Sequence, residues 1–184
     1  RALQAPVLQK PEAKQEAEIR PVVDVPETMT AEQARVSLER SLKFIATSQN
    51  PDGSWCGSGP DSVKELGFSP ETYYTWQLGG CELALLALLQ CESTPERDAA
   101  LDKGFDWFCS TPMPGRGSDW DADWMWPSLY GVVVSTAALE HPRFAAGERR
   151  AKIAARGREF MAVLEANQVP DGGWGYYDDP PFTQ

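Results

Sequence analysis

Three carboxylates alternate with indole rings in one short stretch of the chain, residues 118–126. Asp119, Asp121 and Asp123 are separated by single residues, and tryptophans stand at positions 120, 124 and 126. Carboxylates held close together raise one another's pKa, and a protonated carboxyl can act as a general acid. The π faces of neighbouring aromatic rings can stabilise a cation. This stretch is therefore the strongest candidate for a chemical site, with Asp121 and Asp123 as candidate catalytic residues.

The same acidic stretch has bland interpretations as well. Acidic residues ahead of a helix that we expect to begin near Pro127 would favour its dipole, so they can simply cap that helix. Asp119, Asp121 and Asp123 also alternate as the acids of a calcium loop do, but the glycine and the later glutamate of an EF-hand are missing. A looser cation site stays open as an alternative, whereas the sequence as a whole predicts no metal ion and no cofactor.

The remaining reactive residue types do not form a recognisable frame. His141 is the only histidine, and no nucleophile elbow accompanies it, so we expect a residue at a helix end. No cysteine or histidine cluster has the spacing of a zinc site. Cys81 and Cys91 lie about 15 Å apart on one expected helix, too far for a disulfide. Four reduced, mostly buried thiols are expected, beside two possible pairings: Cys56–Cys81 with Cys91–Cys109, or Cys56–Cys91 with Cys81–Cys109.

Composition excludes several classes of partner. The chain has 184 residues, of which 42% are hydrophobic and 24% charged, which suits a globular domain with its own core. Its formal net charge is −10 and no basic stretch is present, so we expect no binding to nucleic acid or to anionic membranes. The longest apolar run, residues 83–89, is much shorter than a bilayer span, and no transmembrane segment is predicted.

Five helices are expected after a proline-rich arm. Residues 1–29 carry four prolines without a sustained apolar period, which indicates a linker or an extended arm; a Val-rich patch at 22–25 could instead pair along a neighbour. From residue 30 onward no alternating strand pattern occurs, so the fold class is all-α. Helices are expected at residues 31–49, 70–90, 96–109, 127–139 and 145–167.

The expected helices alternate between outer and inner character. The first begins with a capping box at Thr30 and has one apolar stripe, which indicates an outer helix. That stripe consists of Ala34, Leu38, Leu42 and Ile45. Helix 70–90 is apolar almost all round, with Glu82 as the only charge after its first turn, so it should be an inner helix. Helix 127–139 is also inner, and 96–109 and 145–167 are outer. The solvent side of the last helix should carry Arg149, Arg150, Lys152, Arg156 and Arg158.

One phrase of seven residues occurs twice, each time after an expected outer helix. Residues 49–55 (QNPDGSW) return as residues 168–174 (QVPDGGW). Pro-Asp-Gly is turn chemistry, the glutamine amide can bond backbone groups at a helix end, and the tryptophan can cover it. We therefore expect a seam between structural repeats, with the following residues in structural roles: Gln49, Gly53, Trp55, Gln168, Gly172 and Trp174.

Together with the residues ahead of it, this phrase resembles the QW motif of squalene and oxidosqualene cyclases and, more loosely, of protein prenyltransferase β-subunits. A basic and a small residue, then an aromatic and an aliphatic one, precede each glutamine, with three extra residues in the second copy. They are Arg40, Ser41, Phe44 and Ile45, and Arg156, Gly157, Phe160 and Met161. Lys103, Gly104, Trp107 and Phe108 look like the head of a degenerate copy. The resemblance covers residues 31–184 and implies an α/α-toroid, with inner helices around an axis and outer helices around them.

The resemblance also bears on the acidic stretch. Class II terpene cyclases carry an Asp-x-Asp-Asp motif whose central acid donates the proton that starts cyclisation. Asp121 and Asp123 match its first and third positions, but Trp124 stands at the fourth. Tyr73, Trp76 and Trp124 would then line a cavity for an apolar or isoprenoid molecule, although the aromatics of the first inner helix could equally pack between repeats.

The leading hypothesis makes residues 30–184 a segment of a squalene-cyclase/prenyltransferase-repeat protein, acting as a scaffold or as one wall of an apolar cavity. Five helices give a partial α/α-toroid of about two and a half hairpins, so we expect further C-terminal repeats or a partner subunit to complete the arc. One alternative is a fragment of a class II polyprenyl cyclase, an isomerase with an aspartic proton donor. A second alternative is a secreted toroid module that mediates interactions or acts on polysaccharides. The sequence leaves open whether the chain is an enzyme and where it acts.

Overall fold

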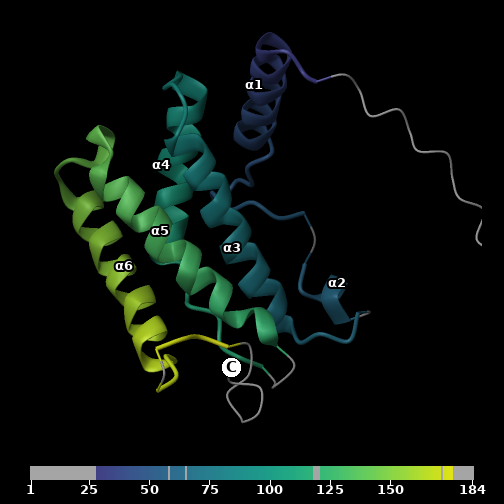
Figure 1. Ribbon diagram of the computed structural model, residues 1–184, viewed down its shortest axis with the longest axis vertical. Helices are drawn as coiled ribbons and strands as arrows, with labels where there is room; N and C mark the ends of the chain where they lie inside the picture. Colours follow the sequence, from purple (N-terminus) through teal and green to yellow (C-terminus); the bar gives the residue numbers. More distant parts are fainter. Residues whose placement is uncertain (1–27, 58, 65, 118–120, 171, 176–184) are drawn as a thin grey trace, which may run out of the picture.

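The computed structural model describes residues 28–57, 59–64, 66–117, 121–170 and 172–175. In this part of the chain there are six α-helices, two short 3-10 helices and no strand, which confirms the all-α class (Figure 1). The five expected helices agree with the observed ones to within three residues at each end. They are α1 (Ala31–Thr47), α3 (Pro70–Leu89), α4 (Pro95–Ser110), α5 (Trp126–Glu140) and α6 (Glu148–Ala166). The short elements α2 (Asp61–Lys64), η1 (Ala122–Met125) and η2 (Pro142–Phe144) were not expected.

Local capping explains where the helices begin and end. Thr30 and Gln33 form the predicted capping box of α1, with reciprocal hydrogen bonds of 2.9 and 3.2 Å. The side chain of Thr94 accepts a bond from the backbone of Arg97 and starts α4. His141 is the residue that ends α5, as expected, and its Nδ1 accepts from the backbone N–H of Arg143 in η2.

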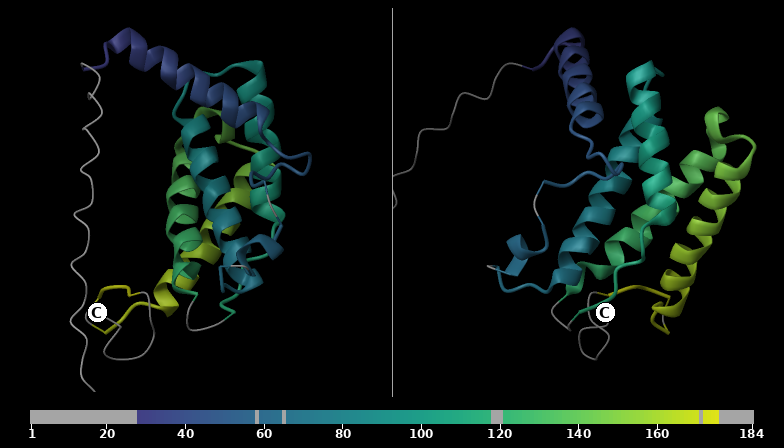
Figure 2. Two further views of the ribbon diagram at one scale, coloured as in Figure 1. Left: turned by 90° about the vertical axis from the view of Figure 1, so that its right-hand side faces the viewer. Right: turned by 180° about the vertical axis from the view of Figure 1, so that it is seen from behind.

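The five long helices lie in two layers (Figures 1 and 2). Helices α3 and α5 pack against each other, and each is backed by the outer helix that follows it in the chain, α4 behind α3 and α6 behind α5. In the outer layer, α4 contacts both α1 and α6. The contacts therefore follow the predicted alternation of outer and inner helices.

The core between these layers is largely aromatic and aliphatic. Phe105 of α4 lies edge-on to Phe108 at 5.8 Å and to Phe144 of η2 at 4.8 Å, measured between ring centroids. Phe108 stacks on Phe160 of α6 at 5.5 Å. Because all four rings are almost fully buried, they join the three elements through the large apolar area that aromatic side chains remove from water.

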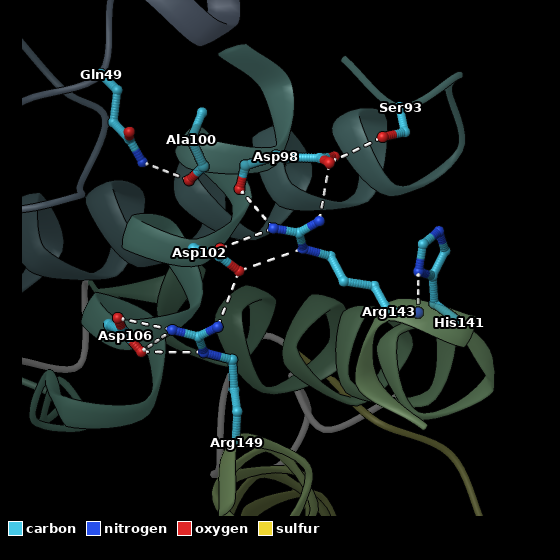
Figure 3. A network of polar contacts seen from close by, with 9 residues as sticks. All are labelled: Gln49, Ser93, Asp98, Ala100, Asp102, Asp106, His141, Arg143 and Arg149. Atoms are coloured by element: carbon cyan, nitrogen blue, oxygen red, sulfur yellow. Dashed lines mark hydrogen bonds and ion pairs between the residues drawn. The ribbon is translucent and has the colours of Figure 1, made fainter. Parts of the chain in front are cut away.

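Ion pairs join the outer layer at its surface (Figure 3). Arg143 of η2 contacts Asp98 at 2.9 Å and Asp102 at 2.7 Å, and Arg149 of α6 contacts Asp102 at 2.8 Å and Asp106 at 3.0 Å. The three aspartates occupy successive turns of one face of α4. The network therefore fixes α4 beside η2 and α6, although each exposed pair contributes only about 0.2–1 kcal/mol.

The predicted buried stripe of the first helix is wrong for its N-terminal half. Only Leu42 is buried, and Ile45 is half-buried, whereas Ala34 is exposed and Leu38 is 52% exposed. The N-terminal part of α1 extends past the other helices, so none of the described helices covers it (Figure 1). Periodicity identifies the apolar face of a helix, but a second element has to be there to bury it.

The two copies of the Gln-to-Trp phrase have the same internal hydrogen bonds. In the first, the Gln49 amide donates to the Gly53 carbonyl at 3.0 Å, and the Trp55 indole donates to the α1 carbonyl of Ile45 at 2.7 Å. In the second, Gln168 donates to the carbonyl of residue 172 and Trp174 to that of residue 164 of α6, both at 2.8 Å. The glycines have φ of +98° and +93°, a conformation that side-chain-bearing residues avoid.

Within the described ranges, the first copy alone bonds a further outer helix. The Gln49 amide also donates to the Ala100 carbonyl of α4 at 2.9 Å (Figure 3). A Cβ atom at Gly53 would lie 2.4 Å from the Lys103 carbonyl oxygen, and one at Gly104 would lie 2.9 Å from the Trp55 ring. The first phrase is thus a seam between α1 and α4 that only glycines permit.

The seam predicts different costs for the same substitution in the two phrases. Gly53→Ala should lower the free energy of unfolding by about 3 kcal/mol, since it combines an unfavourable φ with a collision against α4. Gly172→Ala should cost about 1 kcal/mol, because a Cβ there meets no described atom within 4 Å. Urea unfolding of the two variants measures the difference. Equal losses would contradict the close approach at Gly53.

Candidate functional site

Asp121 fastens η1 to the start of α3. Its side chain is buried, with 3% of its surface exposed. One carboxylate oxygen accepts a hydrogen bond from the Ser69 hydroxyl at 2.9 Å, and the other accepts from the Thr72 hydroxyl. Ser69 precedes α3 but its side chain caps no backbone N–H of that helix. A carboxylate from a distant segment thus lies at the positive end of the α3 dipole, where negative charge is favourable.

Asp123 and two of the predicted ligand-binding tryptophans meet beside this anchor. The Trp76 indole of α3 donates to Asp123 at 2.8 Å, and Trp76 is 39% exposed. Trp124 is half-buried, and the Arg116 guanidinium lies 5.8 Å from its ring centroid. The structure therefore brings together Trp76, Trp124, Asp121 and Asp123 at one end of the inner layer.

Tyr73, one helical turn before Trp76, does not share its exposure. Its side chain is only 8% exposed, and its ring lies edge-on to that of Tyr74 at 5.4 Å. Burial raises the pKa of the Tyr73 hydroxyl. Tyr73 thus follows the packing alternative, and the Trp76 side of α3 is the accessible one.

The interpretation that the acidic residues cap the helix near Pro127 is wrong. Helix α5 begins after Met125, and neither that residue nor Asp121 ahead of η1 makes a side-chain cap to its own helix. The nearest acids bond α3 instead. Asp119 lies outside the described residues, and within the described ranges no group of three His, Cys, Asp or Glu side chains could hold a metal ion.

The inner helices carry large apolar side chains that are partly exposed. Trp76 and Leu83 on α3 are 39% and 47% exposed, and Trp126, Leu129 and Val133 on α5 are 38%, 44% and 46% exposed. Each row has the spacing of one helix face. Because the outer helices cover the opposite side of α3 and α5, both rows lie on the open side of the inner layer. We call these five residues the apolar inner face.

Further aromatic rings extend this face at its Trp end. Phe68 lies edge-on to Trp76 at 5.4 Å, and Tyr130 stacks on Trp126 at 5.7 Å. The sequence-based candidates include Trp76 and Trp124 but miss Trp126, Leu129 and Val133. Their spacing in an otherwise apolar helix carries no sign of which side stays open.

A buried acid behind the inner face was also missed as a site. Glu82 of α3 is 1% exposed, and within the described part of the chain neither of its oxygens has a hydrogen-bond partner. Burial raises the pKa of Glu82 to about 10, with partial opposition from the Arg156 guanidinium. The available signal was that Glu82 is the only charged residue after the first turn of this helix.

Arg156 contradicts its expected place on the solvent side of α6. It is 5% exposed, its guanidinium lies 4.7 Å from the Phe160 ring centroid, and one nitrogen donates to Glu159 at 2.8 Å. Its other two nitrogens, like the hydroxyl of Ser135, lack a partner among the described residues. Glu82 and Arg156 thus place polar groups inside the contact between the two layers.

All four cysteines are free, and neither of the two possible disulfide pairings is formed. Cys81 is buried and Cys91 and Cys109 are half-buried, whereas Cys56 is exposed, which departs from the expectation of mostly buried thiols. Burial raises the pKa of Cys81 to about 12 and that of Cys109 to about 11. Both thiols are therefore neutral and poor nucleophiles near pH 7.

Comparison with known proteins identifies no relative. No family model, no curated protein and no solved structure matches the chain. None of the helices in the described ranges combines the length and apolar character needed to cross a bilayer. Function is therefore inferred from the residues themselves and from their contacts.

Removing the two acids separately distinguishes an anchor from a surface contact. Asp121→Ala should lower the free energy of unfolding by about 3 kcal/mol, because two charge-assisted bonds are lost and the buried Thr72 hydroxyl loses its acceptor. Asp123→Ala should cost less than about 1 kcal/mol, since water can replace it at the exposed Trp76 indole. Chemical denaturation provides both values, and similar losses would argue against the anchoring role of Asp121.

Glu82 predicts a pH dependence of stability with a definite sign. The folded state keeps its proton up to a pKa of about 10, whereas the unfolded chain releases it near the ordinary value of 4.5. The stabilising contribution is therefore complete below pH 4.5 and is lost as pH rises through 10, by at most about 1.4 kcal/mol per pH unit. Glu82→Gln removes this titration. Between pH 4.5 and 10, the unfolding free energy of the wild type should thus fall steadily relative to that of the variant. A difference independent of pH would refute the raised pKa.

Proposed function

We propose that residues 30–184 belong to a squalene-cyclase/prenyltransferase-type α/α-toroid and act as a scaffold whose inner helices form one wall of an apolar cavity. The ligand class is an apolar, isoprenoid-like molecule. The observation that carries this proposal is the apolar inner face, in which two neighbouring helices expose large apolar side chains in register.

The composition of that face suits such a ligand. Contiguous apolar surface on a protein marks a binding region, and small-molecule sites are concave, mostly apolar and rich in aromatic rings. Trp76 and Trp126 give broad flat surfaces, and Leu83, Leu129 and Val133 add aliphatic area. In a toroid the inner helices surround the axis, so this face would look into the central cavity.

The contacts of Asp121 and Asp123 favour a structural role in the cavity wall over a catalytic role. An acid that starts cyclisation must present its proton to a bound ligand, whereas the Asp121 side chain is 3% exposed and both of its oxygens are already occupied by the hydroxyls of Ser69 and Thr72. Asp123 accepts from Trp76 and holds that indole at the edge of the face. We therefore assign both residues to positioning the wall.

Competition binding tests this function. The apolar dye 1-anilinonaphthalene-8-sulfonate should bind the protein and be displaced by farnesol. Trp76→Ala should weaken farnesol binding about tenfold, the effect of losing one buried aromatic contact. Trp174→Ala is the matched control, since it removes an indole that is 49% exposed and lies outside the inner face. Equal weakening in both variants, or no farnesol binding at all, would contradict the proposal.

A further inference from the structure

Helix α1 carries a surface hollow with no occupant among the described residues. The hollow has a volume of about 610 Å³ and is lined by Ser37, Arg40, Ser41, Phe44 and Ile45. Four of these residues are exposed and Ile45 is half-buried, with Phe44 reaching 70% exposure. A large apolar ring is thus left in water on the outer side of the fold.

The hollow has the same residue spacing as the α4 face that receives the first phrase. On α4 the corresponding positions are Ala100, Lys103, Gly104, Trp107 and Phe108. There the Ala100 carbonyl accepts from Gln49, the Lys103 carbonyl closely approaches Gly53, and Gly104 lies against the Trp55 ring. The α1 hollow is therefore the equivalent surface one repeat earlier.

The second phrase is the matching half of this contact. The hydrogen bonds of its glutamine and its tryptophan are those of the first phrase, so these described residues are arranged alike in the two copies. Trp174 is 49% exposed, Gln168 is exposed, and a Cβ at Gly172 would meet no described atom within 4 Å. One molecule thus presents both halves of an interface that it already forms once between α1 and α4.

We propose that the second phrase of one molecule docks into the α1 hollow of a second copy. The Gln168 amide donates to the Ser37 carbonyl, Gly172 approaches the Arg40 carbonyl, and Trp174 covers Ser41 and Phe44. The two surfaces differ, so the contact is heterologous and leads to head-to-tail rings or chains. It uses no residue of the apolar inner face and is independent of ligand binding.

Ser41 makes this contact looser than its template. Where α4 has Gly104, α1 has a side chain, and the Ser41 hydroxyl donates to the Ser37 carbonyl at 3.0 Å. That hydroxyl must rotate away when Gln168 docks, and the Trp174 ring must lie slightly further out than Trp55 does. Since one phrase and one helix face form a small interface, we expect a dissociation constant between about 10 and 100 μM.

Sedimentation velocity between about 1 and 300 μM tests the association. The wild type should form dimers and larger species as concentration rises. Trp174→Ala and Phe44→Asp should each weaken association at least about tenfold, and Ser41→Gly should strengthen it about threefold or more. Trp174 and Phe44 are both substantially exposed, so the variants keep the fold, which circular dichroism checks. Trp76→Ala, the variant expected to lose farnesol binding, should associate like the wild type.

A mixture of the two defective variants identifies the head-to-tail arrangement. Trp174→Ala keeps an intact hollow and Phe44→Asp keeps an intact phrase. At a concentration where the wild type is mostly associated, each variant alone should stay mostly monomeric, whereas an equimolar mixture should form a one-to-one dimer that cannot extend. A wild type that is monomeric at 300 μM, association that survives both substitutions, or a mixture that fails to pair would each overturn the proposal.

Discussion

The approach of α1 to α4 through the first Gln-to-Trp phrase is the contact on which the outer layer depends. The Gln49 amide binds two carbonyls at once, one in its own turn and one on α4, so the end of one helix is fixed to the middle of the next. The Trp55 ring fills the remaining space against Gly104, where a Cβ would also collide with Leu85 of α3. The turn that contains Gln49 and the ring of Trp55 therefore together fix where α4 lies and which of its faces contacts α3.

The inner layer follows from this spacing. Once α4 and α6 are held side by side, α3 and α5 can pack against them only along one side each, and the opposite sides stay open. The open side of α3 carries the large apolar side chains of Trp76 and Leu83, which stay partly exposed among the described residues. The buried Glu82 and Arg156 show that even the covered side tolerates polar groups, which a layer optimised for stability alone would exclude.

Local sequence signals were sufficient to predict the helices but not to predict which of their residues are buried. The capping box at Thr30 marks the start of α1 because the atoms involved are close in the chain. The environment of Leu38 and Arg156 depends on whether another helix lies beside them, and neither periodicity nor charge contains that information. Leu38 was therefore expected in the core and is exposed, and Arg156 was expected in water and is buried.

In the candidate site, too, the residues could be predicted from the sequence but their partners could not. Asp121 and Asp123 were recognised as a pair, yet their partners Ser69, Thr72 and Trp76 come from a helix some fifty positions earlier. Negative charge does lie at a helix start, but that helix is α3, and the bonds come from the hydroxyls of Ser69 and Thr72 and not from capped backbone N–H groups.

The first phrase gives its contact a direction. It joins the turn at the end of α1 to the side of α4, so donor and acceptor are different surfaces and the contact has no twofold symmetry. In the α/α-toroid that we propose, each further seam adds one outer helix and the inner helix that it backs. The apolar face would lengthen with every seam, and an outer helix side with a carbonyl and a small residue at the right spacing would be enough to extend it.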